Sequence, residues 1–295
     1  MDVAVLGAGR LGRAVAQVCA VAGHDVHFYD DDANDVMDGI DVIERRLPAE
    51  TAAVDRLSGT TGLEAAVGDA NVVVETTTTD ATTLQADFAD IETNVDREAL
   101  IVPGAVGVSV TAAAAGLRHP DRAIGLQFCD PLDTPLVEVV VADQTGQGTC
   151  DRARSFVEGL DRSPVVVRDA PGVVSTRTTL ALEAEAMRLV DDGVAGVEAV
   201  DDVLELGFDH ACGPLVQADR AGLGNRLATL ETLHAELGDR FAPPEILRDL
   251  VAAGKTGGPS GEGFYVWENG EPTEPALPSP DIPRRESVPD DPAEE

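Results

Sequence analysis

The sequence predicts an α/β protein, in which a doubly wound parallel sheet is followed by an all-helical domain. Up to residue 169, short segments rich in valine alternate with helical patterns, as in parallel strands joined by helices. From residue 172 onward, the apolar residues recur only with helical spacing. A length of 295 residues is enough for two domains, each with its own core. We therefore expect one domain over residues 1–169 and a helical domain over residues 170–267.

The amino-terminal stretch predicts how the sheet begins. A buried strand from Val3 leads into Gly7-Ala-Gly9-Arg-Leu-Gly12 and then into a helix over residues 13–21. In such a turn the first glycine permits the tight bend, the second lets the backbone approach a pyrophosphate, and the third lets helix and strand pack closely. The pyrophosphate would bind N–H groups at the helix N-terminus, where the helix dipole favours negative charge. The cofactor-binding residues expected here are Gly7, Gly9, Arg10, Leu11 and Gly12.

An acidic residue after the second strand predicts which cofactor binds. Residues 25–29 form that strand, and Asp30 follows at the position where a carboxylate accepts the ribose 2′-hydroxyl of NAD. Asp31 and Asp32 would repel the 2′-phosphate of NADP, so NAD is favoured. Strand, glycine turn, helix, strand and Asp30 in this order predict a Rossmann-type NAD-binding domain rather than an ordinary glycine-rich turn.

The remaining elements follow from their apolar patterns. In the first domain, β-branched runs predict strands at residues 56–61, 71–75, 100–103, 123–128, 136–141 and 164–168. Helical spacing predicts helices at residues 33–47, 62–67, 82–95 and 150–160, with a short helical piece opened by Pro48. In the second domain, helices are expected at residues 173–191, 197–205, 215–221, 225–236 and 244–253. From residue 268, Pro, Glu and Asp dominate, so residues 268–295 are expected to form a disordered acidic tail.

The charge of the chain is extreme, with a formal net charge of −33 and Lys255 as its only lysine. Such an acidic surface argues against nucleic acid or an anionic membrane as a partner. It would also destabilise the folded state by self-repulsion, unless salt shortens the Debye length to roughly 3 Å at 1 M. The composition therefore predicts a cytoplasmic protein of a halophile. The alternative is that the acidity serves a function of its own.

Cysteine positions and apolar runs limit the class of protein further. Cys19, Cys129, Cys150 and Cys212 are scattered without a CxxC pair, so we expect reduced thiols, and neither a disulfide framework nor a metal site. Cys19, which lies among alanines and valines, is expected in the core. No apolar run reaches ~18 residues and the chain opens directly on a strand, so neither a transmembrane segment nor a signal peptide is predicted.

Several further segments have a characteristic order and spacing. They include His119-Pro-Asp-Arg-Ala-Ile-Gly-Leu-Gln-Phe-Cys-Asp-Pro131, Ala170-Pro-Gly-Val-Val174, Gly207-Phe-Asp-His-Ala-Cys-Gly-Pro-Leu215 and Gly254-Lys-Thr-Gly-Gly-Pro-Ser-Gly-Glu-Gly-Phe-Tyr265. Together with the amino-terminal motifs, they make residues 1–267 resemble the 3-hydroxyacyl-CoA dehydrogenase family of fatty acid metabolism. The resemblance implies an oxidoreductase with an NAD domain, a helical domain that forms the homodimer, and an acyl-CoA as the small-molecule substrate.

The catalytic positions of the family are where the resemblance breaks down. In the family a histidine takes the hydroxyl proton, a glutamate orients that histidine, and a serine and an asparagine hold the oxygen. The resemblance places these positions, in that order, on Gln127, on Glu138, in the hydroxyl-free loop at residues 103–107, and on Thr176. A glutamine amide donates a hydrogen bond but has no proton to exchange near neutral pH. Loss of a positioned acid or base typically costs ~10²–10⁴-fold in rate.

Other residues leave alternatives open. His210, in Asp-His-Ala-Cys-Gly-Pro, is either a relocated proton acceptor or a structural cap for the helix that follows. Thr176 either hydrogen-bonds a substrate oxygen or only starts a helix. Glu138 is expected to pair with Gln127 or with water. Glu75 matches a family glutamate near the nicotinamide, and it either has a role in the site or only ends a strand.

Two classes of function remain. The first is an NAD-dependent oxidoreductase of the 3-hydroxyacyl-CoA dehydrogenase type with an altered proton acceptor. The second is a catalytically silent NAD-binding homodimer with a role in regulation or assembly. Few basic residues are available to bind the phosphates of CoA. After the second strand these are only Arg45, Arg46 and Arg56, which either bind a phosphate or lie on a solvated helix face. The substrate is accordingly expected to be a smaller acyl-CoA, or not a CoA ester.

Overall fold

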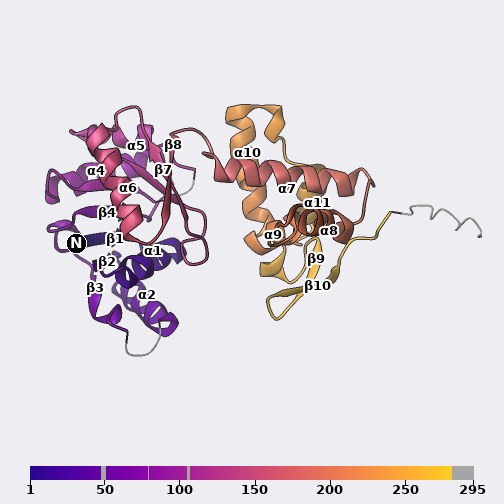
Figure 1. Ribbon diagram of the computed structural model, residues 1–295, viewed down its shortest axis with the longest axis horizontal. Helices are drawn as coiled ribbons and strands as arrows, with labels where there is room; N and C mark the ends of the chain where they lie inside the picture. Colours follow the sequence, from indigo (N-terminus) through magenta and orange to yellow (C-terminus); the bar gives the residue numbers. More distant parts are fainter. Residues whose placement is uncertain (48–50, 79, 105–106, 281–295) are drawn as a thin grey trace, which may run out of the picture. The chain divides into compact units, whose positions relative to one another are not determined.

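The computed structural model describes residues 1–47, 51–78, 80–104 and 107–280 (Figure 1). The chain divides into two compact units, residues 1–177 and residues 178 onward, and each is described by itself. The first unit contains a five-stranded and a three-stranded sheet with their helices, and the second is mostly helical. Nowhere in the described residues does a helix combine the length and the apolar character that a bilayer crossing requires.

The first unit is built on a five-stranded, wholly parallel sheet, as the sequence predicts. Its strands lie in the order β3-β2-β1-β4-β5. The direction of winding reverses between β1 and β4, and the carboxyl ends of strands at such a point form a crevice that takes ligands. The strands are β1 (Asp2–Leu6), β2 (Asp25–Tyr29), β3 (Leu57–Thr60), β4 (Val72–Glu75) and β5 (Leu100–Pro103).

Both faces of this sheet are covered by helices. Val3 and Val5 of β1 pack in one core, whereas Ala4 and Leu6 face the other, because successive strand residues point to opposite faces. The first core contains residues of α1 (Arg10–Val21), α2 (Ala33–Arg46) and α6 (Gln147–Gly159), and the second contains residues of α3 (Leu63–Val67), α4 (Ala81–Asn94) and α5 (Val110–Ala114).

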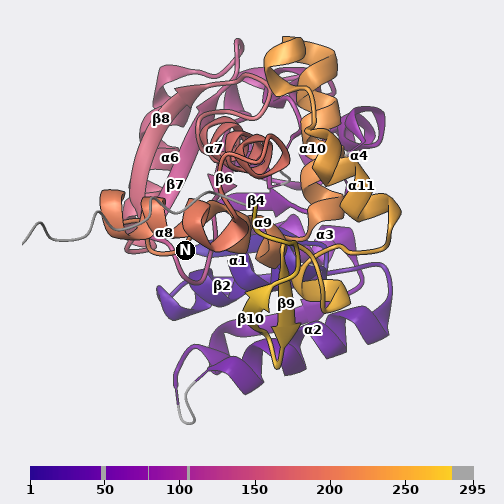
Figure 2. The ribbon, with the colours of Figure 1, turned by 90° about the vertical axis from the view of Figure 1, so that its right-hand side faces the viewer.

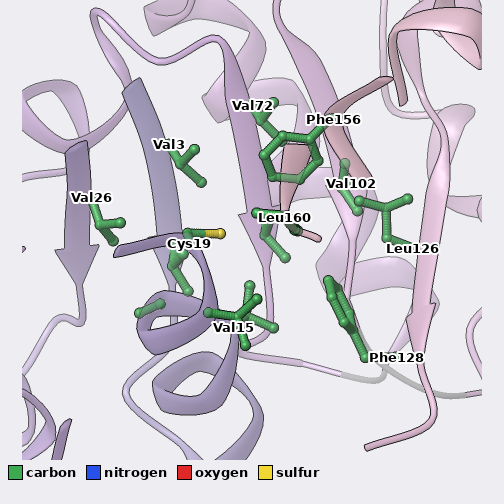
Figure 3. Close-up of a cluster of buried hydrophobic side chains, with 14 of the residues drawn as sticks. Val3, Val15, Cys19, Val26, Val72, Val102, Leu126, Phe128, Phe156 and Leu160 are labelled. Carbon is green, nitrogen blue, oxygen red and sulfur yellow. The ribbon is translucent and has the colours of Figure 1, made fainter. Parts of the chain in front are cut away.

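The first core confirms the buried position predicted for Cys19. Figure 3 shows Cys19 of α1 and Phe156 of α6 among the valines of the sheet. The Cys19 side chain is fully buried, and burial raises the pKa of its thiol to about 12. This thiol is therefore a packing group that stays protonated.

The second sheet differs from the prediction of parallel strands throughout. It has the order β6-β7-β8, and β6 (Gly125–Phe128) runs antiparallel to β7 (Leu136–Val141), whereas β7 and β8 (Ser163–Arg168) are parallel. The reason is the short loop at residues 129–135, since a parallel connection needs about a dozen residues or more. The structure also contains α5 and the short 3-10 helices η1 (Val54–Arg56) and η2 (Pro120–Arg122). The helical piece expected from Pro48 begins outside the described residues.

The second unit contains the five predicted helices, each with at least one end shifted. They are α7 (Ser175–Asp191), which begins in the first unit, α8 (Val197–Phe208), α9 (Pro214–Ala221), α10 (Leu223–Leu237) and α11 (Glu245–Ala252), with the short η3 (Asp239–Phe241) and η4 (Gly258–Ser260). They pack around one core, which includes the fully buried Leu180, Met187 and Leu215.

A hairpin in this unit corrects the expectation of helices only. Strand β9 (Tyr265–Glu268) pairs antiparallel with β10 (Glu271–Pro275), as Figure 2 shows in yellow. The prediction of disorder from residue 268 is therefore wrong for residues 268–275, which form the end of β9, the turn and β10, and residues 281–295 of that tail lie outside the described residues. The fully buried carboxylate of Asp219 accepts hydrogen bonds from the N–H groups of Phe264 and Tyr265 and from the indole of Trp267, at 2.9–3.0 Å. These bonds fix the start of β9 against α9.

Candidate cofactor pocket and catalytic residues

A pocket of about 490 Å³ opens at the carboxyl ends of β1, β2 and β4, where the winding of the sheet reverses. This is the edge at which open α/β sheets bind nucleotides. Its walls come from the loop after β1, the end of β2, the end of β4, and helices α3 and α4. The lining residues are Leu6, Gly7, Ala8, Gly9, Tyr29, Asp30, Asp31, Leu63, Glu75, Thr76, Thr77, Asp87, Asp90 and Ile91.

The three glycines of the loop after β1 meet different surroundings. Gly7 has φ +105°, and a Cβ on it would lie 2.6 Å from the Thr76 hydroxyl oxygen. A Cβ on Gly12 would lie 1.9 Å from the carbonyl oxygen of Gly7, so both positions require glycine for packing. A Cβ on Gly9 would meet nothing within 4 Å. The backbone at Gly9 is therefore accessible from the pocket, because no side chain covers it. This fits a pyrophosphate that lies against it.

The N-terminus of α1 is open to an anion. Gly9 is the N-cap, no side chain caps the helix, and its first turn contains no acidic residue. In contrast, the side chain of Asp32 caps α2 by accepting from the N–H of Asn34 at 2.7 Å. The first helical bond of α1 is made by Arg13, so the N–H groups before it point out of the helix end. Arg10 and Leu11 are among them, but their side chains do not line the pocket.

Asp30 is held in place by the glycine loop. Its carboxylate accepts a hydrogen bond from the N–H of Ala8 at 2.7 Å and a longer one from Asp32 at 3.4 Å. Burial alone raises the pKa of Asp30, but these backbone hydrogen bonds outweigh it and leave the pKa below its ordinary value. A charged, fixed carboxylate at the end of β2 fits the acceptor that a ribose diol requires.

Glu75 is buried at the end of β4 and still lines the pocket. It is 1% exposed, and burial raises its pKa although hydrogen bonds from the hydroxyl and N–H of Thr77 lower it. Its Oε2 atom has no hydrogen-bond partner within the described residues. A buried polar atom of this kind normally has a partner, so the pocket fits a ligand that supplies one.

Some pocket residues were not anticipated from the sequence. The hydroxyl of Thr76 donates to the carbonyl of Leu6 at 2.7 Å and, at 3.3 Å, to that of Gly7, and so ties the end of β4 to the start of the glycine loop. In the sequence, Thr76 is only the first residue of a polar loop, although its place directly after a buried strand is the signal that could have found it. Tyr29, Asp87 and Ile91 carry no such signal, because only the fold brings α4 to the end of β2.

Gln127 and Glu138 lie together, as cross-strand partners on β6 and β7. Glu138 is 2% exposed and accepts hydrogen bonds from the N–H groups of Val174 and Ser175, at 3.0 and 3.1 Å. Its second oxygen accepts from the hydroxyl of Ser175. The carboxylate of Glu138 thus binds the start of α7, a role that the sequence did not indicate, while Gln127 is its cross-strand neighbour. Ser175, which the sequence did not single out, completes this cluster.

The structure places the other catalytic candidates separately. Thr176 is the second residue of α7 and is partly buried, next to the cluster around Glu138. His210 is exposed in the second unit, and its N–H donates to the carbonyl of Leu204 at 3.2 Å. Its backbone therefore closes the end of α8, and Gly213 is the N-cap of α9. Residues 105–106 of the loop that lacks the serine lie outside the described residues.

Comparison with known families assigns both parts of the chain. Residues 2–170 match the model of the 3-hydroxyacyl-CoA dehydrogenase NAD binding domain, and residues 172–267 match that of the 3-hydroxyacyl-CoA dehydrogenase C-terminal domain. A probable 3-hydroxybutyryl-CoA dehydrogenase of Deinococcus radiodurans is 34% identical, over 90% of this chain and 100% of that protein. Another from Bacillus subtilis is 32% identical, over 90% of this chain and 97% of that protein.

Solved structures agree with this assignment. Mycobacterium tuberculosis FadB2 has a TM-score of 0.85 and 28% identity, over 90% of this chain and 98% of that one. The (S)-3-hydroxybutyryl-CoA dehydrogenase PaaH1 of Ralstonia eutropha has a TM-score of 0.84 and 29% identity, over 91% of this chain and 99% of that one.

Proposed function

The chain belongs to the 3-hydroxyacyl-CoA dehydrogenase family, and from this we propose that it passes hydride between NAD and the 3-hydroxyl carbon of a short 3-hydroxyacyl-CoA. It is an NAD-dependent oxidoreductase of this type. The observation that carries the proposal is the pocket at the end of β1, with bare Gly9, an uncapped helix and the fixed carboxylate of Asp30. The named relatives favour 3-hydroxybutyryl-CoA as the substrate to test first.

We assign the cofactor contacts to the residues that line or face this pocket. The N–H groups of Arg10, Leu11 and Gly12 would bind the pyrophosphate, with the backbone of Gly7 and Gly9 lying against it. Asp30 would accept from the adenosine ribose, and Glu75 would supply its free oxygen to a donor of the bound cofactor. NAD, when bound, supplies the acceptor of the hydride.

The substrate oxygen is assigned to Gln127 and Thr176. The Gln127 amide can donate a hydrogen bond to that oxygen, but it cannot accept the hydroxyl proton. The hydroxyl of Thr176 is the second donor, next to the helix start that Glu138 holds. We propose His210 as the proton acceptor, because it is an exposed imidazole and imidazoles are the side chains that most often serve as general bases.

One observation favours a second candidate, a silent NAD-binding protein with a role in regulation or assembly. Both oxygens of Glu138 accept hydrogen bonds from the start of α7, so this carboxylate anchors a helix instead of being reserved for a catalytic base. A steady-state assay with NAD and 3-hydroxybutyryl-CoA in molar KCl separates the two candidates. Turnover by the parent protein supports the dehydrogenase, whereas NADH binding without any turnover supports the silent protein.

The basic residues near β2 support a substrate with few phosphate contacts. Arg56 pairs with Asp25 at 2.8 Å, and the Nε of Arg45 donates to the carbonyl of Asp41 at 2.9 Å. Both side chains thus have partners on the chain itself. We propose a small acyl-CoA whose CoA phosphates lie mostly in solvent.

We propose a homodimer formed through the helical unit. On α8, the apolar side chains of Val203, Leu206 and Phe208 are 57%, 86% and 69% exposed. Contact with a second copy would remove this apolar area from water, at roughly 25 cal/mol per Å². Leu206→Asp is therefore expected to shift the protein from dimer toward the 30.7 kDa monomer in light scattering. A parent protein that is itself monomeric in molar KCl would contradict the proposal.

We propose a cytoplasmic protein that needs high salt. The charge of −33 is distributed along the chain, and the four cysteines are free thiols, two of them buried. Dilution from molar KCl to below 0.1 M lengthens the Debye length from roughly 3 Å to more than 10 Å, so carboxylate repulsion increases. Circular dichroism is expected to show unfolding on this dilution. A chain that keeps its helical signal without salt would remove the halophilic interpretation.

A further inference from the structure

We infer that Asp87 of α4 selects the adenine base by accepting a hydrogen bond from its 6-amino group. The inference rests on the proposed NAD site and names a contact within it. The pocket is wide enough to extend from the glycine loop to the helices α3 and α4, whose residues form its far wall. That wall combines apolar side chains with carboxylates.

The apolar part of this wall suits a flat ring. Leu63 comes from α3 and Ile91 from α4, and both line the pocket. Ile91 is the residue four positions after Asp87, so the two side chains lie on one face of α4. A ring that packs against Ile91 would therefore present its edge to Asp87.

Several carboxylates line the pocket on the side where the adenine ring would lie. Burial, and then the charges of Asp31, Asp30 and Asp87, raise the pKa of the Tyr29 hydroxyl, so these three acidic groups surround it. Burial and the charge of Asp90 also raise the pKa of Asp87 itself. Within the described chain, Asp87 has no hydrogen-bond donor and no cation as a partner. In contrast, the side chain of Asp80, the N-cap of the same helix, accepts from Thr83 at 2.8 Å.

A second observation shows that this pocket is more than an acidic surface. Glu75 lines the same pocket, is 1% exposed, and has a buried Oε2 without a partner within the described residues. Bare Gly9 and the uncapped end of α1 lie in the same wall as Asp30. The pocket is thus shaped for a ligand that carries an anion at one end and donors at the other.

In the adenosine half of NAD, the 6-amino group is the donor that remains for Asp87 once Asp30 binds the ribose. Since the pyrophosphate is negative, further carboxylates in the pocket are favourable only where they meet donors. The adenosine half offers the ribose hydroxyls and the 6-amino group. Asp30, which the N–H of Ala8 holds at the end of β2, takes the ribose. Asp87 comes from a different element, beside the apolar wall, and takes the amino group.

Calorimetry in molar KCl with NADH and reduced nicotinamide hypoxanthine dinucleotide tests this inference. The analogue replaces the 6-amino donor by a carbonyl acceptor and leaves the pyrophosphate and both riboses unchanged. A hydrogen bond to a charged group corresponds to about a 10- to 100-fold difference in affinity. The parent protein is expected to bind NADH more tightly than the analogue by that factor.

Two variants test whether Asp87 causes the difference in affinity between NADH and the analogue. Asp87→Asn is expected to bring the ratio of the two affinities close to one, because an amide can donate to the 6-oxo group. Asp38→Asn removes the same charge from the exposed face of α2 and is expected to keep the parent ratio. Equal affinities in the parent, or an unchanged ratio in Asp87→Asn, would overturn the inference and leave the NAD site in place. Absence of NADH binding by the parent would instead contradict the proposed function.

Discussion

Gly9→Glu is expected to abolish NADH binding while the protein stays folded. Gly9 has φ −69° and ψ −179°, which any residue adopts, and its Cβ would meet no atom of the chain within 4 Å. The new side chain therefore enters the pocket without disturbing the core. Its carboxylate would occupy the place of the pyrophosphate and face the helix N-terminus that the phosphates require. We expect affinity to fall by at least about 100-fold, or roughly 3 kcal/mol.

The control for this prediction introduces the same charge elsewhere. Gly159, at the exposed end of α6, also has no atom within 4 Å of an added Cβ. Gly159→Glu should bind NADH as the parent does, and circular dichroism in molar KCl should show both variants folded. If Gly9→Glu retained the parent affinity, the phosphate would have to lie away from this loop.

The glycine loop illustrates how much a local sequence can predict. The separate roles expected for Gly7, Gly9 and Gly12 are those that a strand, a tight turn and a helix impose on neighbouring residues. The structure gives each role a distinct surrounding: a positive φ, an open space and a close backbone contact. No distant residue was needed for the prediction, although the hydroxyl of Thr76 holds the loop by donating to the carbonyl of Gly7.

Predictions failed where contacts join residues far apart in the chain. Glu138 holds the start of α7 across 36 and 37 residues, and Asp219 holds β9 across 45. A pattern of neighbouring residues contains no trace of such contacts. The hairpin itself was predictable, because Asn269 and Gly270, with φ +53° and +86°, form the two-residue turn that Asn-Gly favours. The acidic composition from residue 268 onward instead led to the prediction of disorder.

Gln127→His is expected to raise kcat for 3-hydroxybutyryl-CoA oxidation by about 100-fold or more. An imidazole can accept the hydroxyl proton, and such a positioned base contributes ~10²–10⁴-fold. The substitution places the imidazole on β6 opposite the buried Glu138, which is its cross-strand partner. Since neutral imidazole is the acceptor, kcat of the variant should rise with pH through about 6.5. Steady-state rates between pH 5.5 and 8.5 measure both effects.

Glu138 limits the size of this gain, and that limit can be measured. Its second oxygen already accepts from the hydroxyl of Ser175, so the new imidazole competes with that hydroxyl for the carboxylate. Ser175→Ala combined with Gln127→His should therefore exceed Gln127→His alone, while Ser175→Ala in the parent should give no gain.

His210, which we propose as the proton acceptor of the parent protein, is tested by its removal. His210→Ala is expected to lower kcat of the parent by about 100-fold or more, and Gln127→His is expected to restore turnover to His210→Ala. If rapid turnover survived His210→Ala and gained nothing from Gln127→His, Gln127 would have to lie away from the reacting oxygen. Because Gln127 and Glu138 are neighbours on adjacent strands, that outcome would also remove Glu138 from the reaction and leave it solely as the carboxylate that anchors α7.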